Sequence, residues 1–143
     1  MITKSQVMSL LVEACPSYAD RFQRYLSDNY DDGDERFLYC ELGDFADHLC
    51  DLLELGSDSE FTDVFAVIES LHIDGDDFVR EAATIGMLEG IQNVSSWRES
   101  ISPNDFEKYL GVTSRKWWNE LNGFWQGKRN YVGEGLEDPD VGT

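Results

Sequence analysis

The chain has 143 residues, of which 41% are hydrophobic and 13% aromatic, and its formal net charge at pH 7 is −18. This length and composition are typical of one globular domain with its own core and exclude a largely disordered chain. The charge disfavours direct binding to nucleic acid or to an anionic membrane, because affinity for phosphate groups comes from lysine and arginine.

Two amphipathic helices are predicted near the start of the chain. Thr3 and Gln6 have the spacing of a capping box, and apolar residues then recur at helical period up to residue 14. Pro16 separates this helix from the next one, and Ser17 is placed to cap the second helix.

A polar loop and two longer helices follow. The segment SDNYDDGDE, residues 27–35, has the composition of a loop. Apolar residues at helical spacing then predict a helix over about 37–55. A further helix is predicted after a cap at Ser57 or Asp58, and Gly75 ends it.

The predicted helix at about 77–93 has almost no polar face, which is typical of a helix buried on most sides. Asp76 is placed to cap it. Ala82, Gly86 and Gly90 recur every four residues and make one side nearly flat. Because each glycine costs about 1 kcal/mol of helix stability relative to alanine, we expect this side to pack closely against a neighbouring helix.

Two helices and a tail complete the predicted fold. Ser102 precedes a proline and is placed to cap a short helix, and Thr113 is placed to cap the last one. Trp117 and Trp118 are adjacent, so one apolar stripe cannot bury both equally, and we expect one of them to be exposed. No segment has the alternation of a β-strand. The sequence therefore predicts an all-α, single-domain bundle of about six to seven helices over residues 1–130, with a flexible acidic tail at 131–143.

Neither a membrane segment nor an export signal is recognisable. No apolar run approaches the roughly 18 residues that a membrane-spanning helix needs, and the first residues lack a basic segment followed by an apolar one. Cys15, Cys40 and Cys50 have no recognised spacing and are typical of reduced thiols. We therefore expect a cytoplasmic protein.

Metal binding and catalysis find little support in the motifs. The acidic turn Asp74-Gly75-Asp76-Asp77 does not fit a calcium-binding loop, since Ser70 and His72 fall where that loop needs its first two ligands. His48 and the cysteines match no zinc-site spacing. Because no nucleophile, phosphate-loop or metalloprotease motif is present either, we expect no catalytic residue, metal or cofactor.

Most of the negative charge lies in one segment. Residues 28–81 contain 18 acidic residues against two basic ones, Arg36 and Arg80. Within this segment, five acidic residues recur every three or four positions along the predicted helix at 37–55: Glu41, Asp44, Asp47, Asp51 and Glu54. Like charges at this spacing repel, and no basic residue follows Arg36 on that helix. The pattern predicts an unneutralised outer face that a basic partner protein would cover. A charged surface that serves only solubility is the alternative.

Two resemblances bear on function. The segment FTDVFAVIES…DGDDFVREAATIGMLEGI resembles one helical hairpin of HEAT or armadillo repeats. The segments ELGDFADHL, FTDVFAVIE, ATIGMLEGIQN and FEKYLGVTSRKWWNELNGFWQGK, within residues 8–128, together resemble an uncharacterised family of small, acidic, all-helical bacterial proteins. Some of those proteins are similar to immunity proteins encoded beside polymorphic toxin genes. The resemblance implies a bacterial antitoxin-type protein that is not an enzyme.

The leading hypothesis is an immunity protein that neutralises a cognate toxin by covering a basic surface, as a monomer in a 1:1 complex. Aromatic residues such as Trp97 would be its anchors. We expect the following residues to contact the toxin: Tyr30, Asp31, Asp32, Asp34, Glu35, Tyr39, Glu41, Asp44, Asp47, Asp51 and Glu54. The alternatives are a nucleic-acid mimic that inhibits a nuclease or defence protein, a HEAT-like interaction module, and an enzyme or metal sensor.

Overall fold

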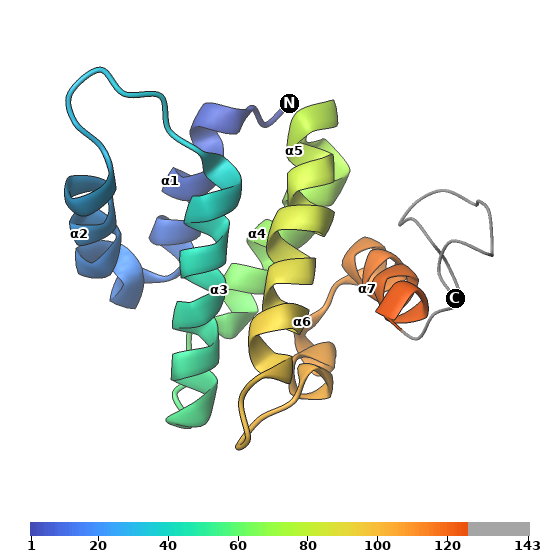
Figure 1. Cartoon of the computed structure of the whole chain (residues 1–143). Coiled ribbons are helices and arrows are strands. Elements are labelled where there is room, and N and C mark those ends of the chain that lie inside the picture. Colours follow the sequence, from blue (N-terminus) through green and yellow to red (C-terminus); the bar gives the residue numbers. More distant parts are fainter. Residues whose placement is uncertain (126–143) are drawn as a thin grey trace.

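The computed structural model describes residues 1–125, and within them every regular element is a helix (Figure 1). The elements are α1 (Lys4–Ala14), η1 (Pro16–Tyr18), α2 (Ala19–Asn29), α3 (Leu38–Glu54), α4 (Phe61–Asp74), α5 (Asp77–Glu81), η2 (Ala82–Leu88), α6 (Glu89–Ser96), η3 (Pro103–Tyr109) and α7 (Val112–Trp125). The predicted all-α, single-domain class is confirmed. The predicted tail at 131–143 and the end of the predicted domain lie outside the described residues.

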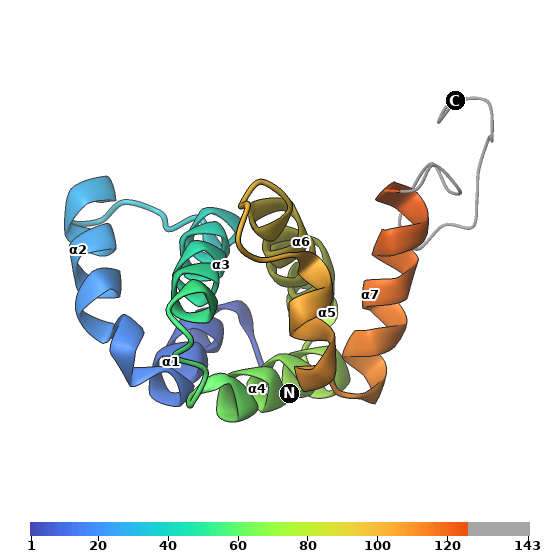
Figure 2. The same ribbon diagram turned by 90° about the horizontal axis from the view of Figure 1, so that it is seen from below.

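Two parallel helices and a third that crosses them form the centre of the fold. α5, the π-helical segment η2 and α6 follow one another without a break and pack beside α3, both running downwards in Figure 1. α4, which comes between α3 and α5 in the sequence, crosses behind the pair in the view of Figure 1 and lies next to α1 (Figure 2). α2 and α7 flank this centre on opposite sides.

The core is rich in aromatic side chains. Tyr18, Phe45 and Trp118 are fully buried. Phe61 and Phe65 on α4 contact Phe106 on η3, with ring centroids 5.9 and 6.2 Å apart. Of the adjacent tryptophans, Trp118 belongs to the core and Trp117 is only partly buried.

The flat side of the continuous helix formed by α5, η2 and α6, the long central helix, packs against a neighbouring helix as predicted, and this neighbour is α3. A Cβ atom at Gly86 would lie 2.7 Å from Tyr39 Cδ1 and 2.8 Å from Leu42 Cδ1. At Gly90 a Cβ atom would lie 3.6 Å from that of Ala46, an ordinary contact. The helix backbone therefore comes closest to α3 at Gly86.

The turn between α4 and α5 forms as predicted and is fixed by the start of the chain. Gly75 ends α4, and Asp76 Oδ1 accepts a hydrogen bond of 2.9 Å from the Val79 amide. The Ile2 amide donates to Asp74 O at 2.8 Å, and the Asp76 amide donates to Ile2 O at 2.9 Å. The acidic turn thus has a structural role within a helical hairpin.

Several boundaries differ from the prediction. The cap of α4 is Glu60 rather than Ser57 or Asp58, and α7 begins at Val112, one residue before the predicted cap. The segments at 16–18 and 103–109 are 3-10 helices, and the π-helical turn at 82–88 was not predicted. Apolar period reports which side of a helix is buried and not how its hydrogen bonds are spaced, so it does not separate these helix types.

Candidate functional site

The acidic stripe of α3 is neutralised by an arginine from another part of the chain. Arg98, which follows α6, lies 2.8 Å from Asp47 Oδ1 and 2.8 Å from Asp51 Oδ1. The carboxylate of Glu54 lies 2.7 Å from the same guanidinium group. The prediction of an unneutralised face on α3 is therefore wrong. Its partner is 44 to 51 residues away along the chain, beyond the reach of a pattern within one helix.

A second arginine, from α2, neutralises the same stripe. Arg21 lies 3.0 Å from Asp44 Oδ1 and 3.0 Å from Asp51 Oδ2, and Tyr18 donates to Asp44 Oδ2 at 2.6 Å. Burial raises the pKa of Asp51, but hydrogen bonds from Arg98 and Arg21 outweigh that effect and hold its pKa below the ordinary value. The stripe thus connects α2 and the segment after α6 to α3.

Glu41, the first residue of the stripe, lies inside the molecule. Its side chain is 1% exposed and accepts two hydrogen bonds from Arg36, at 2.8 and 2.9 Å. Tyr30 donates to it at 2.9 Å, and the Tyr30 hydroxyl accepts from the Phe37 amide at 3.0 Å. Glu41 is therefore not available to a partner, and Tyr30 holds the loop before α3 in place.

Two glutamates of the acidic segment accept hydrogen bonds from the first residues of helices elsewhere in the fold. Glu60 accepts hydrogen bonds from the amide and hydroxyl of Ser17, at 3.1 and 2.5 Å. Glu69 accepts from the amides of Thr113 and Ser114, at 2.9 and 2.8 Å, where α7 begins. Burial raises the pKa of Glu69, but these hydrogen bonds outweigh it and lower the pKa. Each carboxylate therefore caps the N-terminus of a helix in place of a side chain from that helix.

The loop before α3 keeps most of its charge free. Asp34 accepts a 2.8 Å hydrogen bond from the Asp31 amide, which shapes the loop. The carboxylates of Asp31, Asp32 and Glu35 have no ion pair or hydrogen bond among the described residues. The same holds for Asp77 in the first turn of α5, which the sequence analysis did not include among the contact residues. Among the predicted contact residues, the acidic ones without such a partner are therefore in the loop rather than along α3.

Exposed aromatic side chains lie at the same end of the molecule. Phe37 is 58% exposed, Tyr39 41% and Phe78 42%, and the rings of Tyr39 and Phe78 stack with centroids 6.0 Å apart. Lys4 Nζ is 5.3 Å from the centre of the Phe78 ring. We define the α3–α5 end as the following residues: Asp31, Asp32, Glu35, Phe37, Tyr39, Asp77 and Phe78. The predicted anchor Trp97 is 82% exposed but lies at the other end of the long helix, where α6 stops.

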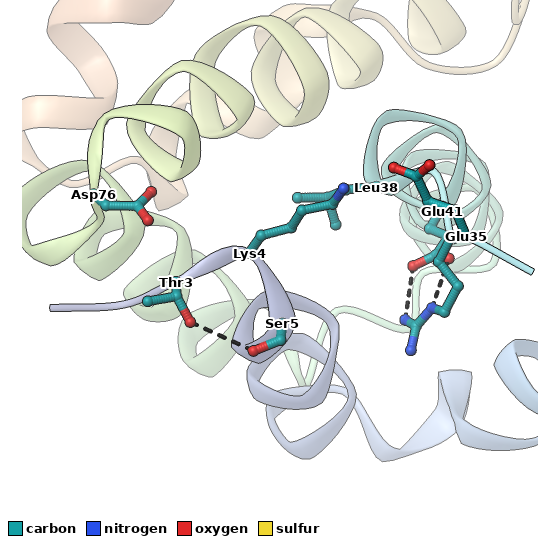
Figure 3. A pocket seen from close by; sticks show the side chains of 8 residues that line it. Thr3, Lys4, Ser5, Glu35, Leu38, Glu41 and Asp76 are labelled. Carbon is teal, nitrogen blue, oxygen red and sulfur yellow. Dashed lines mark hydrogen bonds and ion pairs between the residues drawn. The ribbon is translucent and has the colours of Figure 1, made fainter. Parts of the chain in front are cut away.

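A pocket of about 490 Å³ opens beside the α3–α5 end. Figure 3 shows Lys4 reaching from α1 across it towards Leu38 on α3, with Glu41 on one side and Asp76 on the other. Its lining includes Glu35, so the pocket connects the acidic loop to the start of α5. The pocket therefore gives this end a hollow beside the acidic loop.

The histidines are in polar clusters that hold helices together. His48 Nε2 is 2.9 Å from Ser17 Oγ, and burial lowers the pKa of His48. Because Ser17 donates its only hydroxyl proton to Glu60, His48 is the donor to Ser17 and does not act as a base towards it. Within residues 1–125, no three His, Cys, Asp or Glu side chains come together as a metal-binding group.

A second cavity, which the sequence did not predict, lies between α4, α5, η2 and α7. It has a volume of about 530 Å³, and its wall includes His72, Thr84 and Trp117. No sequence motif marks it, because its lining residues come from four elements and each of them also fits a helix surface.

Comparison with known proteins places the chain in a family without an assigned activity. Residues 8–126 match the family described as a domain of unknown function (DUF7674). The chain belongs to this family. No curated protein and no solved structure matches it. Among the described helices, none is both long and apolar enough to cross a membrane.

Proposed function

We propose that this protein binds a basic surface of a partner protein through the α3–α5 end, and that the partner is a toxin which it neutralises as an immunity protein. The observation that carries the proposal is the combination of unpaired carboxylates and exposed aromatic rings at one end of the fold. The immunity role rests on the family resemblance of the sequence.

The two kinds of residue have different tasks in such a complex. Tyr39 and Phe78 form a stacked pair that loses water on binding, and buried aromatic residues supply much of the energy at interfaces. Asp31, Asp32 and Glu35 carry charge that no arginine among the described residues offsets, so they speed encounter with a positive surface.

The stripe on α3 has a secondary place in this proposal. Asp47 and Asp51 are each 47% exposed in their side chains and can contact a partner at the edge of the interface. Arg98 and Arg21 already offset much of their charge, so they attract a basic surface less than the loop does.

Co-expression with the product of the adjacent gene tests the biological role. If that product arrests growth, we expect the wild-type chain to restore growth and the triple variant D31K/D32K/E35K to fail. The matched control is D20K/D63K/E99K, which reverses three exposed acidic residues outside the α3–α5 end and changes the net charge equally. A neighbouring product that is harmless, or that the wild-type chain does not neutralise, contradicts the immunity role.

Association kinetics with the purified neighbouring product test the surface. At low salt we expect the loop triple variant to slow association more than about tenfold and the control triple to slow it much less. Y39A/F78A should instead speed dissociation, because it removes the anchors and leaves the charge unchanged. Equal effects of the two charge triples would show that net charge, not this end, governs binding.

A further inference from the structure

The cavity between α4, α5, η2 and α7 has the features of a small-molecule site, and it is distinct from the proposed protein-binding surface. Its volume of about 530 Å³ falls within the range of ligand pockets, roughly 300–1,000 Å³. Trp117 and Ile85 supply apolar wall. The π-helical segment η2 contributes Thr84, and such segments occur often at functional sites.

The hydrogen bond between His72 and Thr84 leaves an acceptor in the wall of the cavity. His72 is 5% exposed, and its Nδ1 lies 3.0 Å from Ile68 O, which can only accept, so Nδ1 carries the proton. Burial lowers the pKa of His72 and keeps the ring neutral. Nε2 therefore accepts the hydroxyl proton of Thr84, at 3.1 Å. The Thr84 oxygen retains lone pairs that can accept a hydrogen bond from a ligand.

One further group of the wall needs a donor from a ligand. Glu81 is exposed, and its carboxylate has no hydrogen bond or ion pair among the described residues. A positively charged donor such as an ammonium group satisfies this carboxylate together with the oxygen of Thr84.

One group of the wall needs an acceptor. Arg80 donates its Nε proton to Gly75 O at 2.8 Å, which fixes the root of the guanidinium group. The two terminal nitrogens have no partner among the described residues. Terminal guanidinium nitrogens are suited to a carboxylate, which can accept from both at once.

We propose that this cavity binds a free α-amino acid with an apolar side chain, its carboxylate paired with Arg80, its ammonium group with Glu81 and Thr84, and its side chain against Trp117 and Ile85. The ligand carries both charges and is neutral overall, so the net charge of −18 neither repels nor attracts it strongly. A simple anion would be repelled by that charge, and a simple cation would leave Arg80 unpaired.

Calorimetric titration of the whole chain at pH 7 with each common amino acid tests the proposal. We expect at least one apolar or aromatic amino acid to bind. Its decarboxylated amine and its deaminated acid should each bind at least about tenfold more weakly, a loss of about 1.4 kcal/mol. No binding of any amino acid at about 10 mM, or equal binding of the three compounds, would overturn it.

Variants identify the residues that hold the two charges. E81Q removes a carboxylate that has no partner within residues 1–125, so it should weaken binding at least about tenfold and leave the melting temperature unchanged. R80Q should weaken binding similarly, although it also loses the bond to Gly75 O. The matched controls are E13Q and R24Q, on exposed positions of α1 and α2. If E81Q and R80Q bind the amino acid as well as these controls do, the cavity is not its site.

Discussion

Glu69 is a single side chain on which the position of α7 depends. It accepts hydrogen bonds from Thr113 N, Ser114 N and Ser114 Oγ, at 2.8 to 2.9 Å. Hydrogen bonds to a charged acceptor contribute roughly 1.5–3 kcal/mol, and loss of a helix cap costs about 1 kcal/mol. We expect E69A to lower the free energy of unfolding by about 2 kcal/mol at pH 7, measured by urea denaturation. D63A, an exposed position on the same helix, should change it by less than about 0.5 kcal/mol.

The contribution of Glu69 also depends on pH. Its folded-state pKa is lowered from the ordinary 4.5, because the hydrogen bonds from α7 outweigh burial. The unfolded state therefore binds the proton more readily, and the stabilisation is present above pH 4.5 and lost as the pH falls through the folded-state pKa. The difference between wild type and E69A should thus be largest at neutral pH and shrink in acid. A difference that stays constant from pH 7 to pH 3 would contradict this role for the carboxylate.

At the contact between α3 and the long central helix, replacing two glycines by alanine should have opposite effects on the free energy of unfolding. Glycine to alanine in a helix gains up to about 1 kcal/mol when the methyl group has room. At Gly90 the new Cβ would be 3.6 Å from that of Ala46, so we expect G90A to raise the free energy of unfolding by about 0.5–1 kcal/mol. At Gly86 it would be 2.7 Å from Tyr39, and overpacking costs about 1–3 kcal/mol, so G86A should lower that free energy.

G43A is the matched control for this pair. Gly43 lies in α3, and a Cβ atom there would meet nothing within 4 Å. It should therefore stabilise the protein about as much as G90A, in urea denaturation of the three variants side by side. If G86A proves as stable as G43A, Tyr39 and Leu42 yield easily and the approach of the two helices is looser than the distances indicate.

Local patterns in the sequence predicted elements well and contacts between elements poorly. Gly75 and Asp76 end one helix and cap the next through bonds to residues a few positions away, so their role was predictable. The stripe on α3 was predicted to be unneutralised because Arg21 and Arg98 are distant in sequence. Likewise, the exposed aromatic stack is formed by Tyr39 on α3 and Phe78 on α5, and the pattern within either helix does not predict the contact between them.

The cavity was beyond sequence analysis for a related reason. Thr84 contacts His72 from the π-helical segment η2, and no residue pattern within 82–88 distinguishes a π-helical turn from an α-helical one. Of the predicted contact residues, Asp31, Asp32, Asp34, Glu35 and Tyr39 are accessible, whereas Glu41 is buried. A charge pattern therefore located the acidic segment, and only the fold separated its structural members from its free ones.

The distribution of charge over the whole molecule predicts how salt affects stability. With 29 acidic and 11 basic residues, most pairs of charges repel, and folding brings them closer together. Salt also weakens the ion pairs of Arg21 and Arg98, but partly exposed pairs contribute only about 0–1 kcal/mol each. Because the Debye length falls to about 10 Å at 0.1 M salt, the many longer-range repulsions are screened first. We expect the melting temperature to rise by about 4 °C between 10 and 300 mM NaCl, equivalent to about 1 kcal/mol.

The charge-reversed loop variant separates repulsion from a general effect of salt on stability. In D31K/D32K/E35K each reversal removes a negative charge and adds a positive one, so less repulsion remains for salt to screen. Its melting temperature should start higher than that of the wild type at 10 mM NaCl and rise less by 300 mM. We expect the higher melting temperature of the variant because the three carboxylates have no partner in the described fold, so their loss breaks no ion pair. A wild-type melting temperature that falls with salt would mean that the ion pairs on α3 outweigh the repulsion, and the stripe would then be the main electrostatic support of the fold.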